Sequence, residues 1–279
     1  MKLPGLIVPP LTPFTADLKV DEKALQAGVN YVVEDCNAAM VIAAGVEAQE
    51  YHYLTMEERK NLIAKTLEFV DGRCPVAVGI SQPSFKIAIE LAHYAEKIGA
   101  EAVQLLAPLR PFGGEPTQGE LIAYFEAVSR ESHLPMVLYL NPGPGANVSI
   151  PATIELSQLE RVKYVKESSR DLSRVSRLIS EIELSGRAKY FTTMQNAAHH
   201  LAVGRLWHHP AATRGDAGQQ GDQGFRGRRY AGSGATSVAV CLVPSTLDAQ
   251  WPNANNEGRN EDSQHPRRRS LPTLPAHPR

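Results

Sequence analysis

The chain has 279 residues, a formal net charge of −1 at pH 7, and 43% hydrophobic residues. This length suits one large α/β domain or two small ones, and the small net charge gives no reason to expect nucleic acid or an acidic membrane surface as a partner. The first residues lack the apolar core of a signal peptide, and no apolar run approaches the ~18 residues of a membrane span. Three widely spaced cysteines form no disulfide framework or metal-ligand pattern, so we expect a protein of the reducing cytoplasm.

Short apolar runs alternate with helical patterns along the first part of the chain. Asp21 is expected to cap the first helix, and Ser149, with a proline in the next turn, to open a later one. Thr55 and Thr117 are each followed three residues later by a glutamate, which is the spacing of a capping box. The expected strands are residues 6–8, 40–44, 75–79, 102–106, 136–140, 162–166 and 190–193.

Strict alternation of strand and helix with nearly continuous apolar strands predicts a parallel sheet covered by helices. Seven such units in about 195 residues suit a (β/α)8 TIM barrel better than a doubly wound sheet. Periodicity alone does not separate the two folds. The absence of a glycine-rich dinucleotide fingerprint after the first strand weakens the doubly wound alternative.

The expected sixth strand ends in Lys166. Alternate side chains of a barrel strand point inward, and the C-terminal ends of the strands open on the active-site face. Burial disfavours the charged form of an amine and so lowers its pKa, and a neutral lysine amine can form a Schiff base with a ketone or an aldehyde. The alternative is a solvated surface lysine beside the end of a strand.

Three stretches after strand ends carry a family resemblance: Glu-Tyr-His-Tyr-Leu-Thr at 50–55, Tyr-Leu-Asn-Pro at 139–142, and Tyr-Val-Lys-Glu-Ser-Ser at 164–169. In this order and spacing they resemble the dihydrodipicolinate synthase / N-acetylneuraminate lyase family of class I Schiff-base aldolases, and the resemblance covers residues 1–195. It implies a (β/α)8 barrel that acts, without a cofactor or a metal, on pyruvate or another small 2-oxo acid, usually as a homotetramer.

The same resemblance implies roles for individual residues. Lys166 would form the Schiff base, and the phenol of Tyr139 would move protons during carbinolamine formation and C–C bond making or breaking. The alternative for Tyr139 is a tyrosine at the barrel mouth with a satisfied hydroxyl. Glu50 matches an acidic position whose role looks structural, fixing its loop through backbone hydrogen bonds.

Other positions depart from the family pattern. Glu47, Ala48 and Gln49 stand where the family commonly has two hydroxyl residues and a glycine that contact the substrate carboxylate. Glu47 would repel such a carboxylate unless it is protonated or turned away. Arg110 replaces a tyrosine of the synthase, and Pro144 replaces its substrate-binding arginine. We take Glu47, Ala48 and Arg110 as candidate substrate contacts, and we expect a substrate other than that of the synthase.

Arg110 has two interpretations. It can bind a substrate carboxylate through two hydrogen bonds, or it can be a solvated loop arginine. His52 also invites a metal interpretation, but no second ligand lies at suitable spacing on the same element, which predicts a packing or loop role.

The composition changes after residue 195. Residues 196–279 contain no lysine, isoleucine or methionine and are rich in arginine, proline, glycine and histidine. Reading one base later permits a leucine-rich helix, a glycine-rich turn and a lysine-bearing C-terminal helix like those of the family. We therefore expect a catalytic barrel at 1–195 and an aberrant, out-of-frame tail of low order at 196–279; a natural disordered tail is the alternative.

On the frameshift interpretation the eighth strand and the last helices are missing, which would leave two open sheet edges. The histidine pairs of the tail, including His199 and His200, are then accidents of frame and not metal ligands. The functional alternative to an active enzyme is a catalytically impaired or non-catalytic barrel.

Overall fold

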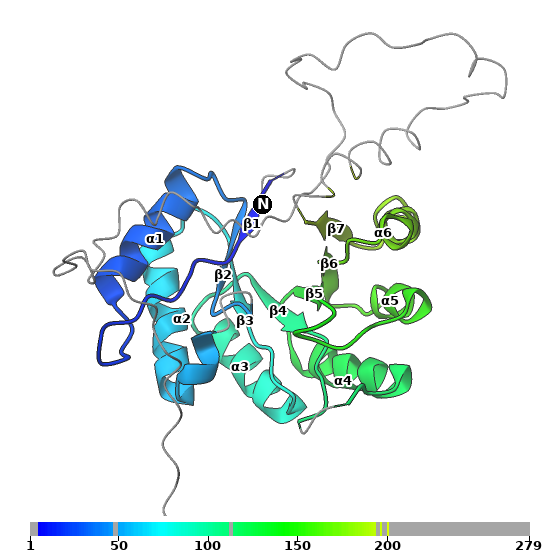
Figure 1. Ribbon diagram of the computed structural model, residues 1–279, viewed down its shortest axis with the longest axis horizontal. Coiled ribbons are helices and arrows are strands. Elements are labelled where there is room, and N and C mark those ends of the chain that lie inside the picture. Colours follow the sequence, from blue (N-terminus) through cyan, green and yellow to red (C-terminus); the bar gives the residue numbers. More distant parts are fainter. Residues whose placement is uncertain (1–4, 47–49, 112–113, 194–195, 197–199, 201–279) are drawn as a thin grey trace, which may run out of the picture. The chain divides into compact units, whose positions relative to one another are not determined.

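The computed structural model describes residues 5–46, 50–111, 114–193, 196 and 200. All described residues belong to one compact unit. That unit contains one parallel sheet whose strands follow each other in chain order (Figure 1). The strands are β1 (Ile7–Val8), β2 (Met40–Ala43), β3 (Val76–Gly79), β4 (Ala102–Leu106), β5 (Met136–Leu140), β6 (Val162–Glu167) and β7 (Lys189–Thr192).

The strand order decides between the two folds that the sequence leaves open. A doubly wound sheet reverses direction at a switch point, whereas each strand here pairs with the next one along the chain from β1 to β7. The sheet curls in one direction with its helices on the outer side (Figure 1). The predicted TIM-barrel architecture is therefore confirmed for strands one to seven, and β1 and β7 are the end strands of the described sheet.

Local sequence signals explain where the helices begin. The Asp21 carboxylate accepts a hydrogen bond from the Ala24 backbone N–H at 3.0 Å, and the capping boxes that begin at Thr55 and Thr117 are both complete, as predicted. A π-helical segment, η2 (Ile179–Glu183), directly follows α6 (Leu172–Leu178). The helices are α1 (Glu22–Glu34), α2 (Met56–Val70), α3 (Phe85–Lys97), α4 (Gln118–Glu131), α5 (Ile150–Leu156) and α6 (Leu172–Leu178).

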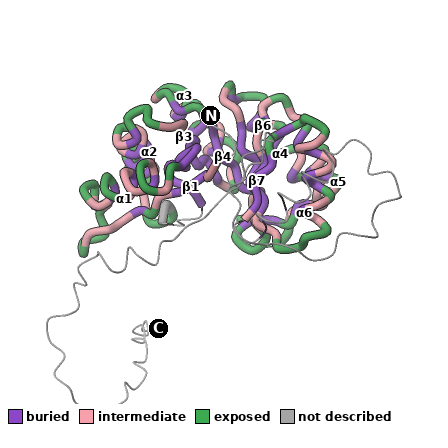
Figure 2. The backbone as a smooth tube through the Cα atoms, turned by 90° about the horizontal axis from the view of Figure 1, so that it is seen from above, coloured by how far each residue is buried: buried purple, intermediate pink, exposed green. Residues whose placement is uncertain are grey.

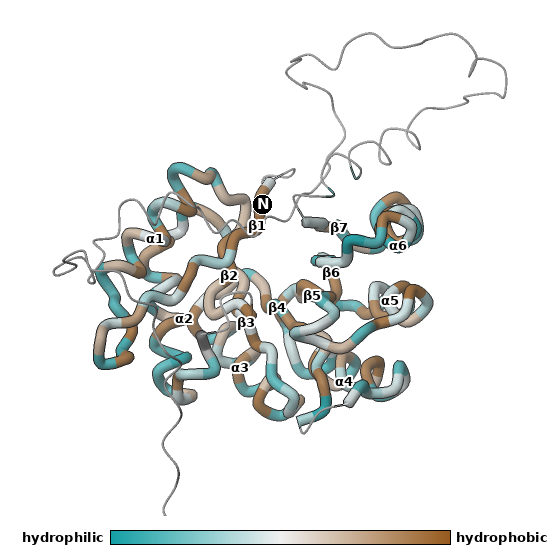
Figure 3. Tube along the Cα trace, in the orientation of Figure 1, coloured by the Kyte–Doolittle hydropathy of each residue, from teal (hydrophilic) through white to brown (hydrophobic). Residues whose placement is uncertain are grey.

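Two apolar layers flank the sheet. Alternate strand residues face the helices and form the larger core, while the other set, including Val137 and Phe191, forms a smaller inner cluster. Buried residues follow the strands while exposed residues lie on the outer surfaces of the helices (Figure 2). Figure 3 shows hydrophobic residues, in brown, on both the strands and the helices. Tyr139 and Lys166 therefore share the inner face, because each lies two residues beyond an inner-cluster side chain, Val137 or Tyr164.

Two residues beyond position 195 are described and both are buried. The Asn196 side chain donates a hydrogen bond to the Ser169 carbonyl at 2.8 Å. The His200 Nε2 atom lies 2.7 Å from a Glu183 carboxylate oxygen, and its ring packs edge-on against Tyr190. Asn196 thus contacts the loop after β6, and His200 contacts β7 and η2. Every helix in the described part of the chain is too short or too polar to cross a membrane.

Candidate active site

Lys166 and Tyr139 lie side by side at the C-terminal ends of β6 and β5. Their Cα atoms are direct partners in the parallel register, and both residues are buried, with 3% and 1% of their surface exposed. The Lys166 Nζ atom lies over the face of the Tyr139 ring, 3.8 Å from its centroid. The ring shields the amine from water and offers it the electron-rich face of an aromatic system.

The hydroxyl of Tyr139 is held by a third residue of the same stretch. The Asn141 side-chain amide donates a hydrogen bond to the Tyr139 hydroxyl at 2.9 Å. The Tyr139 ring packs with Val46, after β2, and with Leu106, at the end of β4. These contacts fix both ends of the phenol, so its orientation relative to Lys166 is set before any substrate arrives.

A buried ion pair holds the strand end that carries the lysine. Glu167 points to the opposite face from Lys166, and its carboxylate accepts a hydrogen bond from Arg174 Nε at 2.9 Å and from the Ser169 backbone N–H at 2.9 Å. Arg174 also donates to the Val148 carbonyl at 2.8 Å and to the Thr153 hydroxyl at 3.2 Å. Burial raises the pKa of Glu167, and the Arg174 guanidinium opposes this rise only in part. The network ties β6 to α5 and α6.

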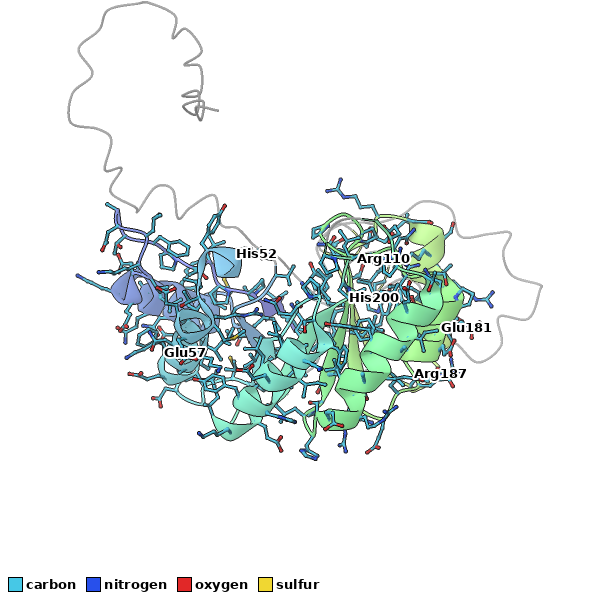
Figure 4. All side chains as sticks on the ribbon, turned by 90° about the horizontal axis from the view of Figure 1, so that it is seen from below. His52, Glu57, Arg110, Glu181, Arg187 and His200 are labelled. Atoms are coloured by element: carbon cyan, nitrogen blue, oxygen red, sulfur yellow. The ribbon has the colours of Figure 1, made fainter. Side chains whose placement is uncertain are left out.

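A pocket of 450 Å³ opens beside Tyr139. Val46 and Leu106, which pack against Tyr139, also line the pocket, although the described lining does not include Tyr139 or Lys166. Two described ionisable side chains line the pocket (Figure 4): His52, from the 3-10 helix η1 (Glu50–Tyr53), and Arg110, from the loop after β4. The described lining residues are Val46, His52, Ser81, Gln82, Pro83, Leu106, Pro108, Leu109, Arg110, Pro111 and Pro144.

Arg110 is paired at the rim of the pocket. Its Nη2 atom lies 3.0 and 2.8 Å from the two carboxylate oxygens of Glu120, in the first turn of α4. Glu120 also accepts hydrogen bonds from the Thr117 backbone N–H at 2.7 Å and from the Thr117 hydroxyl at 2.9 Å. These bonds, first the backbone N–H of Thr117 and then Arg110, lower the pKa of Glu120. Both charged side chains are about half exposed.

The structure brings together part of the predicted site. Lys166 and Tyr139 are in contact, and Arg110 and Pro144 line the neighbouring pocket. Glu47 and Ala48 lie outside the described residues. Glu50 begins η1, but its side chain lies outside the described part of the structure.

Sequence reasoning missed two features of the site. Ser81 and Gln82, directly after β3, belong to no recognisable motif, yet both line the pocket. The ion pair of Glu167 and Arg174 had a usable signal, because an acidic residue following the lysine on a buried strand must face the helices. No group of three or more metal-ligating side chains comes together within the described residues.

The parallel sheet, with a buried lysine against a tyrosine at the C-terminal ends of its strands, places the chain among the α/β-barrel proteins. The family model of the dihydrodipicolinate synthetase family matches residues 2–191. The chain belongs to this family.

Individual relatives agree with this assignment. The chain is 30% identical over 183 residues to a 4-hydroxy-tetrahydrodipicolinate synthase of Methanothermobacter thermautotrophicus, covering 65% of this chain and 63% of that protein. A dihydrodipicolinate synthase structure from Acinetobacter baumannii, complexed with pyruvate, has 27% identity and a TM-score of 0.66, covering 73% of this chain and 68% of that one. The N-acetylneuraminate lyase of Mycoplasma synoviae, at 20% identity and a TM-score of 0.64 over 85% of this chain and 68% of that one, shows the shared fold alone. The matched part spans less than two thirds of the synthase from Methanothermobacter.

Proposed function

We propose that this chain is a Schiff-base-forming lyase or aldolase that acts on pyruvate or another 2-oxo acid through Lys166. The observation that carries the proposal is the buried Lys166 amine over the ring of Tyr139. The amine nitrogen attacks the keto carbon to give a carbinolamine, which loses the former keto oxygen as water and leaves an imine. Loss of a proton from the adjacent carbon gives an enamine, which forms a C–C bond with an aldehyde; the reverse sequence cleaves one.

Tyr139 acts in this proposal as the group that moves protons. Carbinolamine formation and breakdown each require a proton at the former keto oxygen, and a positioned phenol can supply or remove it. The hydrogen bond from Asn141 supports this role because it holds the hydroxyl in one orientation. Glu50 is proposed as a structural residue of the loop after β2.

Arg110 is proposed as a contact for a substrate carboxylate, because it lines the pocket beside Tyr139 and a guanidinium matches the geometry of a carboxylate. Glu47 and Ala48 remain proposed substrate contacts from the loop after β2. We further propose that the protein works in the cytoplasm, and as a homo-oligomer if its reading frame is intact.

Exchange of the methyl protons of pyruvate in D2O tests the proposal without a second substrate. Enamine formation should replace these protons with deuterium, which proton NMR follows directly. Lys166→Ala should abolish the exchange, and Lys163→Ala should leave it unchanged, because Lys163 is an exposed residue of the same strand. Exchange that persists in the Lys166→Ala protein would rule out this lysine as the reactive amine.

A second candidate is a catalytically impaired or non-catalytic barrel. The match to the family model stops at residue 191, within β7, and β1 and β7 are the end strands of the described sheet. The end of the match at residue 191 supports a catalytic barrel at 1–195 followed by an out-of-frame tail at 196–279. The coding DNA around codon 195, and expression beside a frame-restored version, test this candidate. It predicts higher solubility and a higher melting temperature for the restored protein; equal values would refute it.

A further inference from the structure

We propose that the pocket beside Tyr139 binds the far end of a dicarboxylic substrate, with its second carboxylate on Arg110. This inference rests on the proposed function and deepens it, because it names a substrate class for the same site. It makes Arg110 the residue that selects long 2-oxo diacids over 2-oxo monoacids of the same length, whose far end is uncharged.

The size of the pocket favours a substrate longer than pyruvate. Its 450 Å³ volume lies within the range of roughly 300–1,000 Å³ seen for pockets that enclose drug-sized ligands. Val46 and Leu106 form part of its wall and also touch Tyr139. A substrate bound to Lys166 can therefore extend past the phenol into this space.

The charge of the pocket wall favours an anionic end group. Among the described lining residues, Arg110 carries the one permanent charge. The other walls are mostly apolar, with the imidazole of His52 from η1 and the neutral polar groups of Ser81 and Gln82 after β3. An aliphatic chain that ends in an anion matches this distribution of charge.

The present partner of Arg110 shows which anion its guanidinium accepts. The contacts of Arg110 at 3.0 and 2.8 Å are with both oxygens of one carboxylate, that of Glu120. A substrate carboxylate would thus replace a group of the same chemistry. Glu120 keeps its two bonds from Thr117 when Arg110 leaves, and a half-exposed ion pair contributes little to stability. Replacement of Glu120 by a substrate carboxylate as the partner of Arg110 therefore leaves no charge buried or unsolvated.

Borohydride trapping of two six-carbon acids by the full chain tests this inference. The diacid 2-oxoadipate and the monoacid 2-oxohexanoate differ only at the end remote from the keto group. Mass spectrometry measures the fraction of chain trapped as the concentration of each acid is varied. We expect half-maximal trapping of the diacid at a concentration about tenfold lower than that of the monoacid, the effect of one charge-assisted contact.

Substitutions of Arg110 and of its partner Glu120 separate the role of Arg110 from the effect of removing any surface arginine. Arg110→Met should remove the preference by raising the concentration needed to trap the diacid, whereas Arg110→Lys should keep part of the preference. Glu120→Gln keeps a residue suited to the capping box and should strengthen the preference, because it removes the competing carboxylate. Arg177→Met is the control, since Arg177 also pairs with a glutamate, Glu181, at 2.9 Å but does not line the pocket.

The outcomes distinguish this inference from the proposed function. Equal trapping of both acids by the wild-type chain, or a preference that survives in Arg110→Met, overturns the inference and leaves the Schiff-base function standing. Absence of any adduct from either six-carbon acid overturns the inference, and absence of an adduct from pyruvate as well overturns both. Circular dichroism of each variant identifies one that fails to fold, and in that case the Arg110→Lys and Glu120→Gln results decide.

Discussion

The Lys166 amine lies 3.8 Å from the centre of the Tyr139 ring, and the two residues are direct partners across β5 and β6. Their contact is thus fixed by the hydrogen-bonded register of the sheet and not by a mobile loop. A one-residue slip of either strand would send one side chain to the opposite face. The proposed reactive amine and its proposed proton carrier are therefore both positioned by neighbouring strands of the sheet.

Replacing Tyr139 separates the two contributions of this residue. Tyr139→Phe keeps the ring over the amine but removes the hydroxyl, so imine formation should still occur at a rate ~10²–10⁴-fold lower, the usual contribution of a positioned acid or base. Tyr139→Leu removes the ring as well and should also expose Lys166 to solvent. Rapid-quench borohydride trapping measures the rates. An unchanged rate in Tyr139→Phe would exclude the phenol from proton transfer.

The buried pair of Glu167 and Arg174 should be sensitive to the loss of one partner. Arg174→Met leaves the Glu167 carboxylate buried without its guanidinium, which typically costs ~3–5 kcal/mol. Their side chains are only 0% and 12% exposed, respectively, so water cannot replace the lost contact. The double variant Glu167→Met/Arg174→Met should recover much of this loss, because it removes both charges. Urea unfolding measures each value, and additive losses would contradict the pairing.

The raised pKa of Glu167 predicts how stability depends on pH. The folded protein holds the proton of the Glu167 carboxyl more tightly than the unfolded chain does. The stabilisation of the fold by this protonation is therefore fully present below pH 4.5, the usual pKa of a glutamate, and is lost as pH rises through the folded-state pKa. The free energy of unfolding of the wild type, relative to that of Glu167→Gln, should therefore decrease as pH rises through this range. Urea titrations at several pH values measure it; a difference that grows in favour of the wild type with pH would show the opposite sign.

Gly79 should tolerate no side chain. A Cβ atom there would lie 2.3 Å from the Ala44 carbonyl oxygen, which is backbone and cannot rotate away. Gly79→Ala should therefore destabilise the protein by about 1–3 kcal/mol, as overpacking does. Gly28→Ala is the matched control, since Gly28 lies in α1 with nothing within 4 Å, and it should stabilise by about 0.5–1 kcal/mol. Thermal melting of both variants tests the contrast.

Sequence periodicity predicted the secondary structure closely because its signals are local. The seven expected strands differ from the observed ones by at most one residue at either end; the sixth, for example, extends to Glu167. The capping residues fixed the helix starts for the same reason. The π-helical η2 was not predicted, since an apolar face continues through it as through an ordinary helix.

The contact between Lys166 and Tyr139 was predictable because both residues lie at strand ends. Lys166 and Tyr139 each lie near the C-terminal end of an apolar strand, and neighbouring parallel strands place these ends together. The bond between Arg110 and Glu120 was not predictable, because it joins a loop to a helix start through side chains whose direction no periodic pattern fixes. Ser81 was missed for the same reason, although its hydroxyl accepts a hydrogen bond from the Leu106 N–H at 2.9 Å.

Peptide mapping after borohydride reduction with pyruvate tests the central claim most directly. Hydride addition to the imine converts it to a stable secondary amine, and the mass of one peptide then reports which lysine reacted. The account predicts the adduct on Lys166 and none on Lys163, which lies exposed on the same strand. An adduct on Lys163, labelling spread over the exposed lysines, or an unmodified Lys166 in the folded protein would contradict it.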